Sequence, residues 1–257
     1  MSKQGSNGSL KVSSIIKNRT VKLLRSYGYV VSRIVPRDLP DDVAATVRAV
    51  TPYTATSAER QASLIDSVKY IERCRIPGDI VECGVFRGGS IMAVALTLLR
   101  LKSTDRHLFL FDTFEGMPDP GSEDVDSRGI SAKAQLEAVR CYAGLEQVQR
   151  AVLGTGYPED KVHFVKGMVE DTIPERSPQQ IALLRLDTDW YQSTKHELIH
   201  LYPRLVNHGV LIVDDYGYWQ GARKAVDEFI AEMSDPILLN RIDDTGRVAV
   251  KTVSQSR

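Results

Sequence analysis

The hydrophobic pattern after Pro77 alternates between short apolar runs and longer amphipathic segments. Runs dense in Val, Ile, Leu and Phe predict strands at residues 79–83, 107–111, 162–165, 181–186 and 210–213. Apolar residues at helical spacing predict helices at residues 58–74, 90–101 and 223–233. Continuous apolar strands separated by helices indicate a parallel sheet covered by helices on both faces.

The end of the chain shows a different pattern. Residues 237–242 and 247–253 flank the sequence Asp243-Asp244-Thr245-Gly246, whose turn-forming residues predict a hairpin. We therefore expect an α/β fold with a seven-stranded, mostly parallel sheet. Its repeated strand, turn and helix are Rossmann-like, and a C-terminal antiparallel hairpin completes the sheet.

The first part of the chain is basic. Residues 1–37 contain eight Lys or Arg residues and no acid, with apolar positions that suit one face of a helix. We divide the chain into a basic helical extension, residues 1–53, and a main domain, residues 54–257. The basic helix suits docking on the main domain, which we favour, and also suits a partner subunit or an anionic membrane surface.

Composition excludes several classes of protein. The 257 residues are 42% hydrophobic, and 33 basic residues balance 33 acidic ones, so a dedicated nucleic-acid binder is not expected. Cys74, Cys83 and Cys141 form no CxxC pair, which argues against a disulfide framework or a zinc cluster. The apolar stretch Ile91–Leu99 is too short to span a membrane, and the first ten residues lack a signal-peptide core. We expect a cytoplasmic protein.

The turn after the first predicted strand carries the pattern ExGxxxGxS over residues 82–90. Gly84 lets the backbone approach a ligand, N–H groups near Ser90 suit a carboxylate, and Glu82 suits a cationic group. Asp112 ends the second strand, where it suits the diol of a ribose. Ligands bind at the carboxyl ends of such strands. The two features together therefore favour a binding site for an adenosine-containing cofactor over the alternative that both are tight turns with solvated acids.

The fourth and fifth predicted strands also end in acids. Asp187, Asp214 and Asp215 come directly after them, and neighbouring strand ends lie only about 5 Å apart. Such acids can converge on one hard cation, and a site made only of oxygen ligands suits Mg²⁺, Mn²⁺ or Ca²⁺. The alternative is that the acids cap helices, a role that suits Asp189.

Two further motifs have competing interpretations. Residues 196–200 match the zinc-protease pattern HExxH, but the neighbouring Leu198 and Leu201 predict that both histidines lie opposite the buried face, toward solvent. Residues 187–189 form a DxD sequence that can hold the metal of a sugar-nucleotide glycosyltransferase. That interpretation leaves the turn at residues 82–90 unexplained.

Residues 112–126 are acidic and contain Gly and Pro, which fits either a lid or a solvated loop.

Taken together, these motifs resemble the macrocin-type sugar O-methyltransferases of the tylosin, mycinamicin and novobiocin pathways. The resemblance extends from about residue 54 to 241. It is carried by residues 77–89 (PGDIVECGVFRGG), 111–118 (FDTFEGMP), 167–172 (GMVEDT), 186–189 (LDTD), 201–205 (LYPRL) and 214–216 (DDY).

The resemblance implies a class I methyltransferase fold, S-adenosylmethionine as the methyl donor and a divalent metal, Mg²⁺ or Mn²⁺. It assigns the metal to Asp187, Asp214 and Asp215. The implied cofactor-binding residues are Glu82, Gly84, Gly88, Gly89, Ser90, Asp112, Gly167 and Asp171, with Thr54, Arg60 and Ser63 as further candidates from the preceding helix. Asp187 is the first choice of general base, and Asp189 or a loop histidine is the alternative.

We therefore expect an O-methyltransferase that acts on a sugar hydroxyl of a glycosylated natural product or polysaccharide. A catechol-type O-methyltransferase, a DxD glycosyltransferase and a non-catalytic cofactor-binding scaffold are the alternatives. The resemblance also implies that copies of the chain associate into a homo-oligomer.

Overall fold

The computed structural model describes residues 26, 35–139 and 142–252, without the side chains of 137–139. Residues 39–257 form one compact unit, and the described part of that unit is considered below. The predicted basic helix of residues 1–37 lies almost wholly outside the described residues, so the division at residue 53 stays a prediction. Among the described residues, no helix is both long and apolar enough to cross a membrane.

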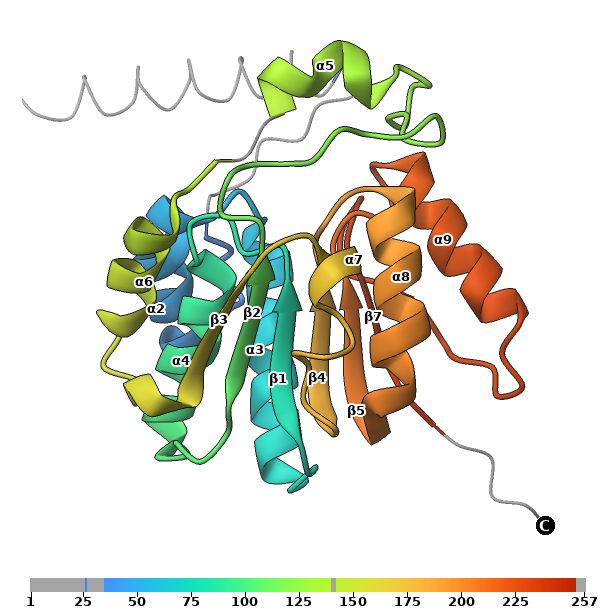
Figure 1. Ribbon diagram of the computed structural model, residues 1–257. Coiled ribbons are helices and arrows are strands. Elements are labelled where there is room, and N and C mark those ends of the chain that lie inside the picture. The colour runs from blue at the N-terminus through green and yellow to red at the C-terminus, as the bar shows by residue number, and fades with distance from the viewer. Residues whose placement is uncertain (1–25, 27–34, 140–141, 253–257) are drawn as a thin grey trace, which may run out of the picture. The chain divides into compact units, whose positions relative to one another are not determined.

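The centre of the unit is a seven-stranded sheet with the order β3-β2-β1-β4-β5-β7-β6 (Figure 1). The first five strands are parallel, and β7 runs antiparallel between β5 and β6. This confirms the expected mostly parallel sheet with a C-terminal antiparallel pair. The strands are β1 (Asp79–Cys83), β2 (Leu108–Asp112), β3 (Val162–Lys166), β4 (Ile181–Leu186), β5 (Leu205–Val213), β6 (Asn240–Arg241) and β7 (Arg247–Val250).

Helices cover both faces of the sheet, as predicted (Figure 1). One face carries α2 (Asp41–Val50), α3 (Ala58–Arg73), α4 (Gly89–Leu101) and α6 (Leu145–Leu153). The other face carries α7 (Val169–Thr172), α8 (Tyr191–Leu201) and α9 (Gln220–Ala231). The central strand β4 is buried along its whole length, because helices pack against it from both sides.

The last three strands differ most from their predicted extent, and β7 ends at Val250 rather than at residue 253. β5 begins at Leu205 rather than at residue 210, and a register shift between Ile181 and Leu183 of the neighbouring β4 accommodates its polar first half. β6 has only two residues, although the apolar run suggested six. Sequence pattern located each strand, but pairing with its neighbours decided where each one ended.

Register between the strands brings the site residues to one level. Cys83 pairs with Leu186, and Leu186 pairs with Val213, so the next residues of β1, β4 and β5 leave the sheet together. The acids after β4 and β5 therefore face the glycine turn after β1. This is the carboxyl edge of the parallel strands, where α/β sheets bind ligands.

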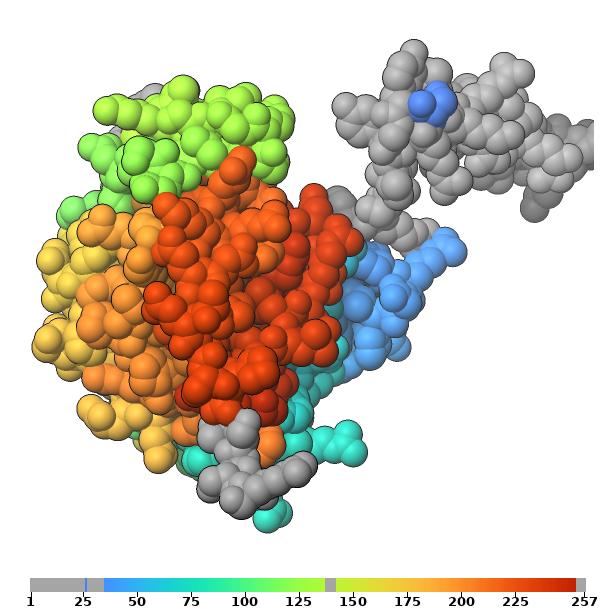
Figure 2. All heavy atoms as spheres, turned by 90° about the vertical axis from the view of Figure 1, so that its right-hand side faces the viewer, coloured from blue at the N-terminus to red at the C-terminus, as the bar shows by residue number. Residues whose placement is uncertain are grey.

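A long segment after β2 crosses this edge and leads to α5 (Ala132–Val139). In Figure 2 its green residues lie across one end of the unit, above α9. A β-bridge joins Asp126 to Trp219, and a buried cluster packs Ala132 against Trp190, Trp219 and Ala222. We call residues 113–131 the covering loop. These contacts attach the covering loop to α8 and α9, and the choice between a lid and a solvated surface loop stays a prediction.

Candidate active site

A cavity of about 500 Å³ lies at the carboxyl edge of the sheet. Its walls come from the ends of β1, β2, β3, β4 and β5, from residues 53–56, and from the covering loop. Of the predicted site residues, the cavity is lined by Gly84, Ser90, Asp112, Gly167, Asp187, Asp189, Asp214, Asp215, Thr54 and Arg60. A cavity of this size and position suits a cofactor together with a small acceptor.

The turn after β1 forms one wall of this cavity. Gly84 has a φ of +80°, and a Cβ atom there would lie 2.0 Å from the carbonyl oxygen of Asp187, so only glycine fits. Gly88 also has a positive φ, as the N-cap of α4, and Gly89 begins that helix. Ser90 is buried, and its hydroxyl accepts a hydrogen bond from Gln61 Nε2 at 2.8 Å.

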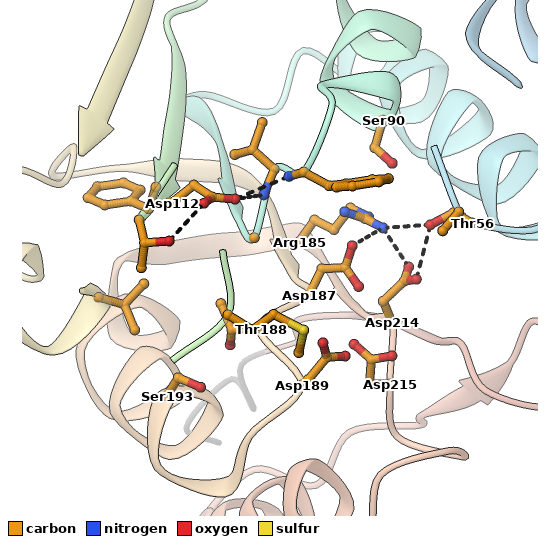
Figure 3. Close-up of a pocket in the computed structure, with 18 of the residues that line it drawn as sticks. Thr56, Ser90, Asp112, Arg185, Asp187, Thr188, Asp189, Ser193, Asp214 and Asp215 are labelled. Carbon is orange, nitrogen blue, oxygen red and sulfur yellow. Dashed lines mark hydrogen bonds and ion pairs between the residues drawn. The ribbon is translucent and has the colours of Figure 1, made fainter. Parts of the chain in front are cut away.

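Asp112 orders this turn from the end of β2 (Figure 3). Its Oδ2 accepts hydrogen bonds from the backbone N–H groups of Val85 at 2.7 Å and Phe86 at 3.1 Å. Its Oδ1 accepts one from the N–H of Phe114 at 2.7 Å. The carboxylate thus fixes the loops after β1 and β2 and still lines the cavity.

The loop after β3 places a different acid from the expected one at the cavity. Gly167 lines the cavity, but Asp171 is exposed and does not line it. Glu170 lines it instead, and its buried Oε2 has no hydrogen-bond partner. Since α7 is a single short helical turn, adjacent residues point in different directions, and sequence alone could not choose between the two acids.

Three acids converge at the floor of the cavity (Figure 3). One oxygen each from Asp187, Asp189 and Asp215 lies within 4.8 Å of the other two, and all three residues are half-buried. Enclosure and the neighbouring acids raise the pKa values of Asp187 and Asp215 well above their ordinary range, and burial raises the pKa of Asp189 to about 7. Such crowding is unfavourable without a cation.

Asp214, the third predicted metal ligand, points to arginines. Its Oδ2 pairs with Arg60 and accepts a hydrogen bond from Thr56 at 3.3 Å, and its Oδ1 lies 2.9 Å from Arg185 Nη2. The structure therefore brings Asp189, rather than Asp214, into the cluster with Asp187 and Asp215. Asp214 lies beside this cluster and is 1% exposed.

Sequence reasoning missed Arg185. It lies on β4 and is 3% exposed, with Nη1 2.6 Å from Glu82 Oε1 and Nη2 2.8 Å from Asp187 Oδ2. Burial raises the pKa of Glu82 to about 7, although Arg185 opposes the rise. Glu82 itself lies beneath the cavity rather than in its lining. A single arginine in the otherwise apolar run IALLRL was the feature that could have indicated a buried ion pair.

The candidates on α3 separate in the structure. Arg60 bridges Asp214 to Asp243 in the hairpin before β7, with Nε 3.0 Å from Asp243 Oδ2. The carboxylate of a cofactor would therefore have to compete for a guanidinium that already has two partners. Ser63 lies on α3 outside the cavity lining, whereas Thr54 lines the cavity.

The HExxH sequence forms no metal site. Glu197 is fully buried and accepts a hydrogen bond from Thr188 Oγ1 at 3.0 Å, on the side of α8 toward the sheet. His196 and His200 are half-buried rather than solvent-facing as expected, and His196 Nε2 lies 3.0 Å from the carbonyl oxygen of Ile173. Within the described residues, no further ligand joins the two histidines in a group of three.

Comparison with known proteins identifies the family of this chain. A family described as macrocin-O-methyltransferase (TylF) matches residues 20–250. The chain belongs to this family. It is therefore an S-adenosylmethionine-dependent O-methyltransferase, and the expected resemblance is confirmed.

Relatives in the macrocin O-methyltransferase family match most of the chain. The 8-demethyl-8-(2,3-dimethoxy-alpha-L-rhamnosyl)-tetracenomycin-C 4'-O-methyltransferase of Streptomyces olivaceus is 33% identical over 229 residues, 88% of this chain and 82% of that protein. The mycinamicin III 3''-O-methyltransferase of Micromonospora griseorubida is 34% identical, and the match covers 69% of this chain and 70% of that protein. The solved structure of the O-methyltransferase NovP has a TM-score of 0.71 and 27% identity, covering 94% of this chain and 100% of NovP.

Proposed function

We propose that this methyltransferase transfers the methyl group to a sugar hydroxyl of a glycosylated natural product or polysaccharide, with the help of a divalent cation. The observation that carries the proposal is the acid cluster of Asp187, Asp189 and Asp215 at the floor of the cavity. The printed names of two relatives support the acceptor class, because one methylates a rhamnosyl tetracenomycin and the other mycinamicin III.

The residues present fit Mg²⁺ or Mn²⁺. Every donor at the floor of the cavity is a carboxylate oxygen, which hard cations prefer. The buried Oδ2 of Asp215 has no hydrogen-bond partner, so it is left for another ligand. Asp187 and Asp215 would hold the metal, with Asp214 the third ligand that the resemblance implies and Asp189 within reach. A bound cation supplies Lewis acidity toward the oxygen that is methylated.

The chain's own residues then have distinct roles. The turn at residues 84–90 and Gly167 would hold the cofactor, with Asp112 at its ribose. A sugar hydroxyl is a poor nucleophile, so a carboxylate must accept its proton. Asp187 is our first choice of base, and the pKa of Asp189, raised to about 7 by burial, suits it to the same task. The covering loop excludes water from the reacting groups.

Replacing Asp187 by Asn tests this assignment. The substitution preserves shape but removes the charge, so we expect turnover to be lost while the dissociation constant for S-adenosylhomocysteine stays within about threefold. Asp171→Asn is the matched control, because Asp171 is exposed outside the cavity. Calorimetry measures binding, and methyl transfer to a panel of glycosides measures turnover. Full activity in Asp187→Asn would refute the role.

Other acceptors give different results in the same assays. A catechol-type enzyme would methylate aromatic diols in preference to vicinal saccharide diols. A DxD glycosyltransferase would be stabilised by a nucleotide sugar. We also propose that copies of the chain associate, which the molar mass in solution tests directly.

A further inference from the structure

Arg185 lies between two groups of acids that the proposed reaction uses for different ligands. Its Nη1 is 2.6 Å from Glu82, which immediately precedes the cofactor turn. Its Nη2 is 2.8 Å from Asp187 and 2.9 Å from Asp214, at the acceptor side of the cavity (Figure 3). One guanidinium thus contacts the ends of three neighbouring strands.

The position of Arg185 is set by the backbone. Arg185 pairs in register with Glu82 on β1 and with Ile212 on β5, so its side chain leaves the sheet beside both neighbours. Nη2 also donates a hydrogen bond to Thr56 Oγ1 at 3.1 Å, which closes the network from the segment before α3. The side chain is 3% exposed, so solvent screens these contacts weakly.

The shape of the guanidinium matters as well as its charge. Its planar fork directs Nη1 toward Glu82 and Nη2 toward Asp187 and Asp214 at the same time. A lysine ammonium has the same charge at a single point, and it cannot span both groups of acids. Burial acts to lower the pKa of Arg185, but the surrounding acids raise it, so the group is a permanent cation.

We propose that Arg185 is a positioning residue that couples the cofactor side of the cavity to the acceptor side. The inference rests on the proposed function. A divalent cation at Asp187 would repel the guanidinium and leave Arg185 paired more strongly with Glu82. Glu82 Oε2 is buried and has no hydrogen-bond partner, so the ammonium group of a bound cofactor would compete with Arg185 for this carboxylate. Each ligand therefore weakens the binding of the other, and the coupling is equal in both directions.

The test measures binding without catalysis. Calorimetry gives the dissociation constant for S-adenosylhomocysteine with and without saturating Mn²⁺, and electron paramagnetic resonance gives the affinity for Mn²⁺ alone. In the unmodified protein, we expect Mn²⁺ to raise the dissociation constant about fivefold or more. In Arg185→Lys, we expect the coupling to fall below about twofold, and the affinity for Mn²⁺ to fall about 10- to 100-fold.

Arg106→Lys is the matched control. Arg106 is also a well-buried arginine, 12% exposed, but it pairs with Glu72 and the carbonyl of Gly78, at the opposite end of the strands. A purely structural loss would lower the melting temperature in both variants. Only Arg185→Lys should change ligand binding and coupling, while Arg106→Lys keeps the coupling of the unmodified protein.

A milder variant keeps the test decisive if Arg185→Lys does not fold. Thr56→Val removes only the hydroxyl that joins Arg185 to Asp214, and we expect it to reduce the coupling at least twofold. Unchanged coupling in the folded variant, or equal losses in Arg106→Lys, would overturn the inference. If the unmodified protein binds both ligands without coupling, the inference alone fails. If it binds no Mn²⁺, the metal-assisted step of the proposed function fails as well.

Discussion

Asp124 anchors the covering loop, and its removal should release that loop. The carboxylate is 2% exposed and accepts two backbone hydrogen bonds, from the N–H of Tyr191 at 2.8 Å and from that of Gly121 at 2.7 Å. Tyr191 is the first residue of α8, whose N-cap, Trp190, supplies no side-chain hydrogen bond. Asp124 therefore caps α8 from a distant part of the chain, where the helix dipole favours a negative charge.

The magnitude follows from these contacts. Loss of a capping side chain costs about 1–2 kcal/mol, and loss of a second buried hydrogen bond to a charged group adds about 1 kcal/mol. Asp124→Ala should therefore lower the free energy of unfolding by about 2–3 kcal/mol. For a unit of this size, that corresponds to a fall of about 4–12 °C in melting temperature.

Thermal unfolding and trypsin cleavage after Arg128 measure the two consequences. The side chain of Arg128 is 67% exposed within the covering loop, so faster cleavage reports release of the loop. Glu123→Gln is the matched control, because the side chain of that neighbouring acid makes surface contacts, a 2.8 Å hydrogen bond from Ser122 and a 3.7 Å ion pair with Lys224. If Asp124→Ala melted and was cleaved like Glu123→Gln, the anchoring role would be refuted.

A second substitution reaches the same contact from α9. A Cβ at Gly221 would lie 2.0 Å from Asp124 Oδ1, so Gly221→Ala should expel the carboxylate and destabilise the protein to a similar extent. The double variant should melt no lower than the worse single variant, because both remove one contact. Fully additive losses would contradict this explanation.

Two further predictions concern single acids and histidines. Because Glu170 lines the cavity with an unpartnered oxygen, Glu170→Ala should weaken binding of S-adenosylhomocysteine about tenfold. Calorimetry checks this against Asp171→Ala, which should bind normally. Burial and the adjacent His107 lower the pKa of His163, so the unfolded chain binds more protons. The melting temperature should therefore fall as the pH drops below about 6.5, and His163→Phe should reduce the slope of melting temperature against pH.

The fold could be predicted because its pattern is local. The apolar runs and the turn at residues 82–90 identify the parallel strands, and their order places Asp112 and Asp187 at one edge. The limits of β5 and β6 could not be predicted, because pairing with β4 and β7 determines them. The strand propensity of individual residues carries no information about where two paired strands shift register.

The site was predictable in its residue types and less so in its contacts. The sequence places four aspartates after β4 and β5, but only the structure shows that Asp214 faces Arg60 and Arg185 while Asp189 joins the cluster. Pairings of this kind depend on side-chain direction and on partners from other elements, such as Arg60, which is 154 residues from Asp214 along the chain. The same limit applies to Glu170, which differs from Asp171 only in the direction it faces on a short helix.

The contact between Gly84 and the carbonyl of Asp187 constrains how the enzyme can evolve. No side chain fits at Gly84, so the turn after β1 and the backbone at Asp187, the proposed base, can shift only together. The covering loop carries no such constraint, since a few anchors such as Asp124 attach it to the helices behind. We expect acceptor range to diversify by exchange of residues 113–131 on an unchanged catalytic floor. Chimaeras that swap this loop between family members are therefore a practical route to new methylated sugars.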